Sequence, residues 1–289
     1  MINSFIPELW EANLLIGARK ALVYGQPGVI NRNYEGQFAQ KGDTVHITGI
    51  GPVTVGDYVK GSDMGAPEQL SDAEATLTIS QQKYFNFAVE DLDRAQAAGN
   101  FEGQARDEAM YALADARDQY IAGLWNEASA QNRLGTTAAA IVPVLTAAAV
   151  LNIFNVLIDC ATLLTNSKVP TEGRFIIIPP WIEAMITKEF HMSGASAPGL
   201  GTQAAMNGFI GRVAGFDVLV SHNVPRATAT TLYRCIFGSS KAITFADQIN
   251  KVEAIRDPDQ FRDVIRGLDV YGAKVVQPDY LGVLTASVT

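Results

Sequence analysis

The glycine- and alanine-rich segment 193–211 contains a spacing that is typical of nucleotide cofactors. Gly199, Gly201 and Ala204 fit the pattern G-x-G-x-x-A, in which small residues let a helix N-terminus approach a pyrophosphate. That pattern binds a cofactor when a strand precedes the glycines directly, and here Gly, Ser and Pro residues precede them. The segment is therefore predicted to be a loop, and a cofactor-binding enzyme is the alternative of a different class.

Metal binding is a second chemistry that the residue types could support. The three histidines, His46, His191 and His222, are far apart and none has a second ligand four residues on, so a site would need all three to converge. The two cysteines, Cys160 and Cys235, lack the paired spacing of a zinc module. The sequence predicts no metal and no cofactor, and it predicts reduced, structural thiols.

Two carboxylate pairs are explained by local backbone structure. Glu90 and Asp93 precede a helical pattern, where the helix dipole favours acids. Asp257 and Asp259 flank a proline in a predicted turn. No nucleophile stands in a recognised catalytic motif. No catalytic residue is therefore predicted, and we expect a protein that is not an enzyme.

Composition and charge limit the class of protein. The 289 residues are 48% hydrophobic and 18% charged, which provides for a large core and excludes a disordered chain. The net charge of −8 is concentrated in residues 42–135, which hold 6 basic and 15 acidic groups. A duplex-binding domain would instead show a basic stripe. The most apolar segment, 138–164, is interrupted by Pro143 and Asp159, so neither a membrane span nor a signal peptide is predicted.

Helical periodicity is clearest between residues 101 and 128. Apolar residues recur there every three or four positions, which indicates a helix of about 42 Å. A globule of this chain length has a diameter of about 50 Å, so the helix indicates an elongated subunit. A short helix is predicted for 181–190. Another is predicted for 146–164, with an apolar face of Val150, Phe154, Leu157, Ile158, Ala161 and Leu164.

Strands are predicted where apolar residues alternate or cluster. Residues 44–48 and 75–80 alternate strictly between apolar and polar types. Further strands are expected at 175–178, 216–220, 231–237, 241–245 and 268–276. Because helices and strands follow one another without a regular βαβ order, the predicted fold class is α+β.

The first two strands predict a hairpin with a very long tip, residues 49–74. A structureless connection of this length is unusual in a compact domain, and ordering it costs on the order of 25–50 kcal/mol of backbone entropy. Its larger apolar residues are too few for a core of their own: Ile50, Val53, Val55, Tyr58, Val59, Met64 and Leu70. We therefore expect this loop to lie on another subunit.

Short motifs along nearly the whole chain carry a family resemblance. They lie at 5–10 (FIPELW), 21–24, 31–35, 41–45, 169–179, 211–218, 221–225 (SHNVP), 242–246 and 267–276. Each is short, but their order and spacing resemble the major capsid proteins of tailed double-stranded-DNA bacteriophages, which have the Hong Kong 97-type capsid fold.

The resemblance implies an architecture of four parts. These are an N-terminal arm (1–41), an extended loop (42–88), a peripheral domain with a spine helix (89–140 with 250–289) and an axial domain (141–249). In that family the loop reaches over a neighbouring subunit and plate-like bodies tile a shell. The resemblance therefore accounts both for the long loop that has no core of its own and for the long helix.

The function implied is that of a structural major capsid protein. Copies of the chain would self-assemble, as pentamers and hexamers, into the icosahedral shell around a double-stranded DNA genome. A maturation shift would re-seat the arm and the loop on neighbours. The expected subunit-contact residues are the seven loop residues above, together with Phe5, Ile6, Leu9 and Trp10 of the arm.

The resemblance also implies partners and a location. Because the arm-like sequence begins almost at Met1, we expect a separate scaffolding protein, besides a portal and a decoration protein. DNA would be contacted weakly on the inner face, through Arg19, Lys20 and Arg32. Lys60 lies in the loop, where some shells cross-link a lysine to an asparagine, but no cross-link is expected here.

The chain is expected in the virion, after assembly in the host cytoplasm and without a membrane partner. A nanocompartment shell of the encapsulin type is the alternative with the same fold.

Overall fold

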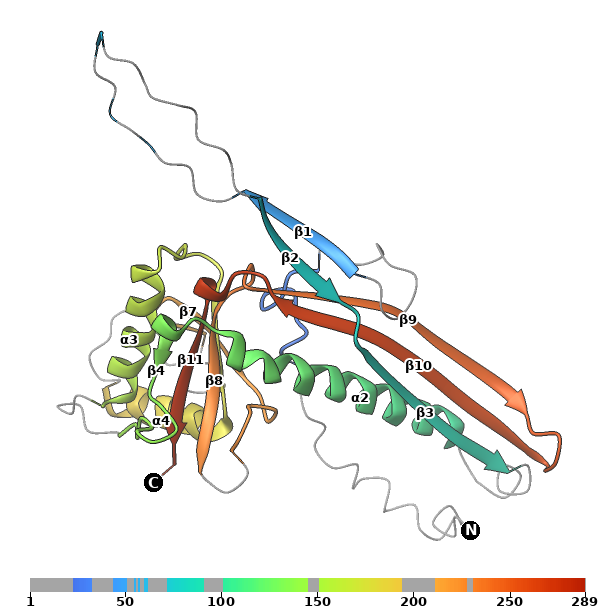
Figure 1. Cartoon of the computed structure of the whole chain (residues 1–289). Coiled ribbons are helices and arrows are strands. Elements are labelled where there is room, and N and C mark those ends of the chain that lie inside the picture. The colour runs from blue at the N-terminus through green and yellow to red at the C-terminus, as the bar shows by residue number, and fades with distance from the viewer. Residues whose placement is uncertain are drawn as a thin grey trace.

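The computed structural model describes residues 23–32, 44–50, 55, 57, 60–61, 72–90, 101–144, 151–193, 211–227 and 231–288. Within these residues the strands form three sheets, of two, three and six strands. Figure 1 shows that the six-stranded sheet lies in a body at one end, while the three-stranded sheet extends away from it alongside a long helix. The molecule is elongated, in agreement with the helix length predicted from the sequence.

Six short strands form the sheet of the body. Their order is β4 (Arg133–Leu134), β11 (Leu281–Ser287), β8 (Leu232–Ser239), β5 (Arg174–Ile178), β7 (Phe216–Val220) and β6 (Arg212–Val213). All five residues of β5 are buried, as expected of a strand that is covered on both faces. Helices α3 (Ile153–Asn166) and α4 (Pro180–Ser193) contribute to the same core.

The two cysteines lie in this core, Cys160 on α3 and Cys235 on β8. Both are buried and unpaired, so the prediction of reduced thiols is confirmed. Burial raises the pKa of each thiol above its ordinary value. The reactive thiolate is therefore suppressed in the folded chain.

The three-stranded sheet has the order β3 (Gln81–Glu90), β10 (Arg262–Val275), β9 (Ile243–Arg256) and is antiparallel throughout. Strands β9 and β10 each have 14 residues, a length of about 46 Å. Helix α2 (Phe101–Ala122) runs along this sheet (Figure 1). The pairing of β10 with β9 shifts between Leu268, opposite Lys251, and Val270, opposite Gln248, so β9 has a bulge opposite Asp269.

Asp269, the residue opposite this bulge, joins the sheet to helix α2. The Asp269 carboxylate is fully buried, and the guanidinium of Arg117 on α2 donates a hydrogen bond to each of its oxygens. Beside this pair, the Tyr120 ring meets the Tyr271 ring edge-on, with centroids 5.5 Å apart. Such a bidentate pair has one favoured geometry, so it fixes where α2 crosses the sheet.

Replacing Asp269 with leucine is expected to destabilise the chain by about 3 kcal/mol, because the largely buried Arg117 loses its acid. The double replacement Arg117→Met with Asp269→Leu should recover most of that loss, since apolar side chains can replace a buried ion pair. Urea unfolding of the wild type and of both variants measures the difference. Equal stability of Asp269→Leu and the wild type would show that the pair does not hold helix and sheet together.

The predicted hairpin is confirmed as β1 (Thr44–Ile50) and β2 (Asp72–Thr78), which pair antiparallel from Thr44↔Thr78 to Ile50↔Asp72. The strands continue past the predicted ends, so the connection is 51–71 and not 49–74. Figure 1 shows the hairpin leaving the body on a different side from the three-stranded sheet.

The helix boundaries needed correction. Helix α2 ends at Ala122 and not at residue 128, and a 3-10 turn over Gly123–Glu127 follows it. Glycine is a poor helix former, so the helix tightens there. Helix α3 begins at Ile153 and not at residue 146, because Asn152 caps it: its side chain accepts a hydrogen bond from the N–H of Phe154 at 2.9 Å. Residues 145–150 lie outside the described residues.

The apolar face of α3 also differs from the prediction. Ile158 is 52% exposed, whereas it was expected to be buried. The buried residues are Ile153, Val156, Leu157, Cys160 and Leu164. They follow the i, i+3, i+4, i+7 pattern that starts at the capped first residue, so the misplaced helix start explains the misplaced face.

Several strands agree with the prediction and others were missed. The strands predicted at 175–178 and 216–220 are β5 and β7, and α4 covers the predicted helix 181–190. Strand β3, strand β11 and most of β9 were not predicted. Residues 81–88 pair with β10 and not within the loop hairpin, and β11 joins the body sheet although 250–289 was expected with the spine helix.

In the described part of the chain, no helix is both long and apolar enough to cross a membrane.

Candidate functional site

The root of the N-terminal segment, residues 23–32, is built into the core. Val23, Tyr24, Val29 and Ile30 are buried. The N–H of Asn31 donates to the Ile243 carbonyl at 2.8 Å, and the Asn31 carbonyl accepts from the N–H of Phe245 at 3.0 Å. The expected arm 1–41 therefore includes a fixed stretch that connects the start of β9 with the body.

One carboxylate on α2 holds this root in place. Asp118 is 1% exposed, and its Oδ1 accepts hydrogen bonds from the backbone N–H groups of Val23, Tyr24 and Gly25 at 3.2, 2.7 and 3.1 Å. The side chain of Asn223, in a turn of the body, donates to Oδ2 at 3.3 Å. Asp118 therefore joins three parts of the chain that are distant in sequence: the arm root, the spine helix and the body.

Burial raises the pKa of Asp118, although the N–H donors and the Asn223 amide favour its charged form. A buried carboxylate that loses hydrogen bonds is costly, which explains why four donors surround this one. Composition and spacing gave no signal for this role, because the donors come from segments 94 and 105 residues away.

Arg32 is part of the same root. Its Nη2 donates to the Gly25 carbonyl at 2.9 Å, and its guanidinium lies 5.5 Å from the centre of the Phe245 ring. This residue was expected to contact DNA together with Arg19 and Lys20, which lie outside the described residues. The described contacts of Arg32 are made within the chain.

The expected loop contacts are Ile50, at the end of β1, and six residues of the connection between β1 and β2. Val55 is 93% exposed, and Ile50 ends β1 opposite Asp72. Lys60 and Gly61 form a turn. The other expected contact residues lie outside the described residues: Phe5, Ile6, Leu9, Trp10, Val53, Tyr58, Val59, Met64 and Leu70.

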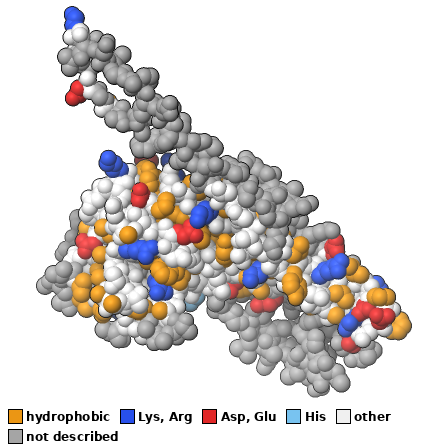
Figure 2. Space-filling model, viewed as in Figure 1, with side chains coloured by type: hydrophobic (Ala, Val, Ile, Leu, Met, Phe, Trp, Pro, Cys, Tyr) orange, Lys and Arg blue, Asp and Glu red, His pale blue; other side chains and the backbone are white. Residues whose placement is uncertain are grey.

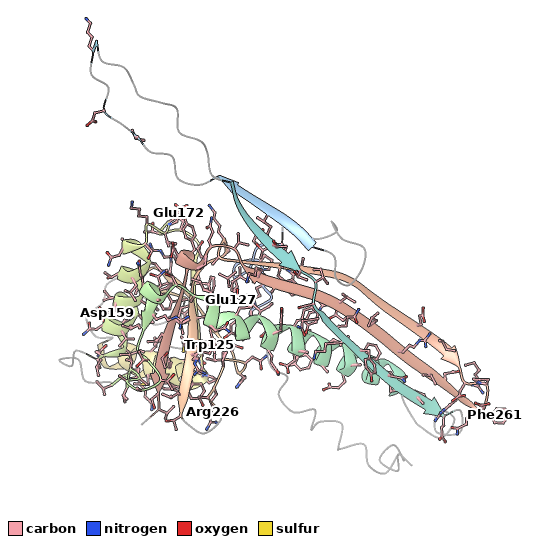
Figure 3. The ribbon with its side chains drawn as sticks, in the orientation of Figure 1. Trp125, Glu127, Asp159, Glu172, Arg226 and Phe261 are labelled. Carbon is pink, nitrogen blue, oxygen red and sulfur yellow. The ribbon has the colours of Figure 1, made fainter. Side chains whose placement is uncertain are left out.

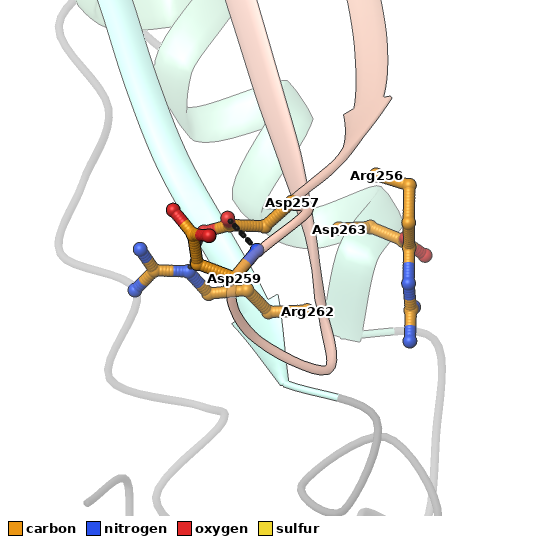
Figure 4. Close-up of polar contacts among 5 residues, drawn as sticks. All are labelled: Arg256, Asp257, Asp259, Arg262 and Asp263. Carbon is orange, nitrogen blue, oxygen red and sulfur yellow. Dashed lines mark hydrogen bonds and ion pairs between the residues drawn. The ribbon is translucent and has the colours of Figure 1, made fainter.

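The tip between β9 and β10 is a surface that the sequence did not reveal. The predicted turn at Asp257 and Asp259 is confirmed: the Asp259 N–H donates to Asp257 Oδ1 at 3.1 Å. Arg262 donates to Asp257 Oδ2 at 2.6 Å, which lowers the pKa of that carboxyl. A second ion pair joins Arg256 to Asp263 at 3.0 Å. Figure 4 shows both pairs flanking the turn.

The exposed aromatic residue at this tip is Phe261, which is 85% exposed. Figure 3 places it at the far end of the molecule from Asp159 and Glu172, and Figure 2 shows hydrophobic and charged side chains together at that end. An aromatic ring in the turn sequence DPDQF was the available signal, but its exposure depends on the strands that were not predicted in full.

The candidate metal and cofactor residues do not form a site in the described residues. No group of three His, Cys, Asp or Glu side chains able to hold a metal occurs there. His222 lies exposed in a turn, and the 199–204 glycine motif lies outside the described residues. Glu90 was interpreted as a helix cap, which is wrong: it is the last residue of β3, opposite Arg262.

The comparisons with known proteins agree on one family. The family model described as "Phage capsid protein" matches residues 73–286. A solved structure from Mycobacterium phage Che8 is 32% identical, with a TM-score of 0.74 and coverage of 98% of both chains. The capsid structure of Cyanophage P-SCSP1u is 17% identical, with a TM-score of 0.72 and coverage of 95% of this chain and 91% of that one. Among curated protein sequences, none matches.

Proposed function

This chain belongs to the phage capsid protein family, and from that membership we propose how its surfaces join neighbouring copies. It is a structural major capsid protein with the Hong Kong 97-type fold, and copies of it form the icosahedral capsid of a bacteriophage. The comparisons give no support to a nanocompartment or to a cofactor-binding enzyme. The proposal concerns which parts of the chain make the contacts.

The β1–β2 hairpin and its connection reach over an adjacent subunit. The observation that carries this assignment is the apolar Val55, which lies in the connection between β1 and β2 and is 93% exposed. The ribbon is anchored by Ile47 and Leu77, which form a small core with Ala246 of β9. The connection beyond it is rich in apolar residues and gains stability when a neighbour covers it. The loop contacts are Ile50, Val53, Val55, Tyr58, Val59, Met64 and Leu70, and the arm adds Phe5, Ile6, Leu9 and Trp10.

The two larger sheets belong to different parts of the capsid subunit. The body, with its six-stranded sheet, corresponds to the axial part that meets copies in pentamers and hexamers. The three-stranded sheet with α2 corresponds to the peripheral part. The hydrogen bond between Asp118 of α2 and Asn223 of the body helps hold these parts in one orientation, which a subunit needs if many copies are to close into a shell.

Packaged DNA is held mainly by confinement within the shell. Tight, sequence-independent binding depends on neutralising phosphates with Lys and Arg, and the chain carries a net charge of −8. Weak contacts on the inner face involve Arg19, Lys20 and Arg32. Assembly takes place in the host cytoplasm with a separate scaffolding protein, a portal and a decoration protein.

Velocity sedimentation of the full chain, expressed with and without a candidate scaffolding protein, tests this proposal. We expect particles of many subunits, with a yield that rises when the scaffold is present. A monomer or small oligomer under both conditions, with the chain folded by circular dichroism, would contradict the assembly proposal.

A further inference from the structure

The two faces of the three-stranded sheet differ in what covers them. Side chains alternate between faces along a strand, and on β10 the buried positions Ile265, Asp269 and Tyr271 lie toward α2. The positions between them point the other way. Leu268 on β10 is 43% exposed and its partner Tyr84 on β3 is 78% exposed. In the described residues, this second face carries a large aromatic residue in contact with solvent.

A pocket of about 390 Å³ lies on this open face. Its residues come from all three strands: Tyr84, Phe85, Asn86, Glu253, Arg266, Gly267 and Leu268. On one side, Arg266 Nη2 and Nε donate to Glu253 Oε2 at 2.9 and 3.2 Å. The pocket therefore combines an apolar side, from Tyr84 and Leu268, with an arginine–acid pair.

Gly267 contributes backbone to this pocket, and its other side faces α2. A Cβ built there would lie 2.3 Å from the Phe85 ring, so that ring lies directly against the glycine backbone. Phe85 also stacks on Phe87, with centroids 5.9 Å apart. The backbone under the pocket is thus supported from the α2 side.

The tip of the same sheet, between β9 and β10, carries an exposed aromatic side chain that could enter an apolar pocket. Phe261 is 85% exposed, and two ion pairs with the Asp257 turn hold the hairpin on which it stands. A hairpin that is already held in one conformation loses little backbone entropy on binding, and buried aromatic rings dominate interface energies. Figure 3 shows Phe261 at the extreme end of the sheet, beyond its neighbours.

Phe261 cannot fill the pocket of its own chain. It comes directly before β10, seven residues ahead of Leu268, which corresponds to about 24 Å. A contact between the two sites must join different copies. Two copies can make this contact reciprocally across a two-fold axis, or head to tail around a ring.

We propose that Phe261 of one subunit inserts into the Tyr84–Leu268 pocket of a neighbouring subunit in the shell. Charge complementarity supports a second copy as the occupant. The tip carries Arg262 paired with Asp257, and the pocket carries Arg266 paired with Glu253, so the two pairs can meet with each arginine facing the other's acid. This inference rests on the proposed function, since it places a contact within the assembled shell.

Disulfide formation in particles of the full chain tests the contact. We expect the double variant Phe261→Cys with Leu268→Cys to give about tenfold more covalently linked oligomers on non-reducing gels than either single variant, since docking raises the local thiol concentration. The native cysteines are buried and should not contribute. The alternative occupant of the pocket is the β1–β2 connection of a neighbouring subunit. A disulfide between subunits in the double variant Val55→Cys with Leu268→Cys would show that contact.

Two results would overturn the proposal while leaving the shell intact. One is particles in which Leu268→Cys links to Val55→Cys and not to Phe261→Cys, and the other is particles with neither link. If the full chain formed no particles at all, the proposed function would fail, and the contact with it.

A second measurement covers the case in which the cysteine variants do not assemble. A benzophenone-bearing phenylalanine analogue in place of Phe261 keeps the aromatic ring and can be cross-linked by light. Mass spectrometry should find the linked peptide within residues 81–90 or 262–275 of another copy. Links confined to other segments would contradict the proposal.

Discussion

Replacing Asp118 with alanine is expected to lower the free energy of unfolding by about 3 kcal/mol or more. The change removes the acceptor of three backbone N–H groups at the arm root, and each buried donor left unsatisfied costs about 1–3 kcal/mol. For a chain of this size the midpoint of thermal unfolding should fall by at least about 6 °C. Calorimetry or circular dichroism on the unassembled chain measures the shift.

Gln119→Ala is the matched control for this prediction. Gln119 is the next residue on α2, it is exposed, and its hydrogen bond is to Asp115. Surface changes of this kind stay within about 0.5 kcal/mol. If Asp118→Ala were as mild as Gln119→Ala, Asp118 would not be what holds the arm root in place.

The pH dependence of the same variant has a definite sign. Because burial raises the pKa of Asp118 above its ordinary value of 3.8, the folded chain binds a proton at this site more tightly than the unfolded chain. That contribution to stability is fully present below the unfolded pKa and is lost as pH rises through the folded pKa. The gap between wild type and Asp118→Ala should therefore be wider in mildly acidic than in alkaline buffer.

The double substitution Tyr58→Asp with Met64→Asp is expected to abolish shell formation while the subunit stays folded and soluble. Both residues belong to the 51–71 connection, which has too few large apolar residues to form a core. Two charges placed in a contact with a neighbouring subunit would be desolvated without partners, which is strongly unfavourable. Sedimentation reports assembly, and circular dichroism reports the fold.

A conservative pair of changes at the same two positions is the matched control, because it tests whether any substitution in the loop disturbs assembly. Tyr58→Phe with Met64→Leu keeps the apolar area and should form shells with nearly the wild-type yield. If the aspartate variant also formed wild-type shells, the loop would not be a subunit contact.

Much of the fold follows from local sequence patterns. The alternation of residues 44–48 and 75–80 predicted the β1–β2 hairpin, and the apolar run 175–178 predicted the buried β5. Both patterns reflect which face of a strand is buried, which is a local property. The family resemblance then predicted the fold class that the structure and the comparisons confirm.

The remaining features depend on long-range partners. Strand β3 begins with three polar residues, and its partner β10 begins 172 residues after the end of β3, so the sheet could not be assembled from either segment alone. Asp118 looks like an ordinary surface acid of a helix until the arm root lies beside it. Phe261 becomes an exposed tip only because β9 and β10 extend well beyond the body.

Electron microscopy of particles formed by the full chain tests whether this protein builds a capsid shell. We expect closed polyhedral shells built from rings of five and six subunits, with the hairpin of each subunit lying over its neighbour. Folded chain that stays monomeric or forms only small oligomers, with and without its scaffolding protein, would contradict it.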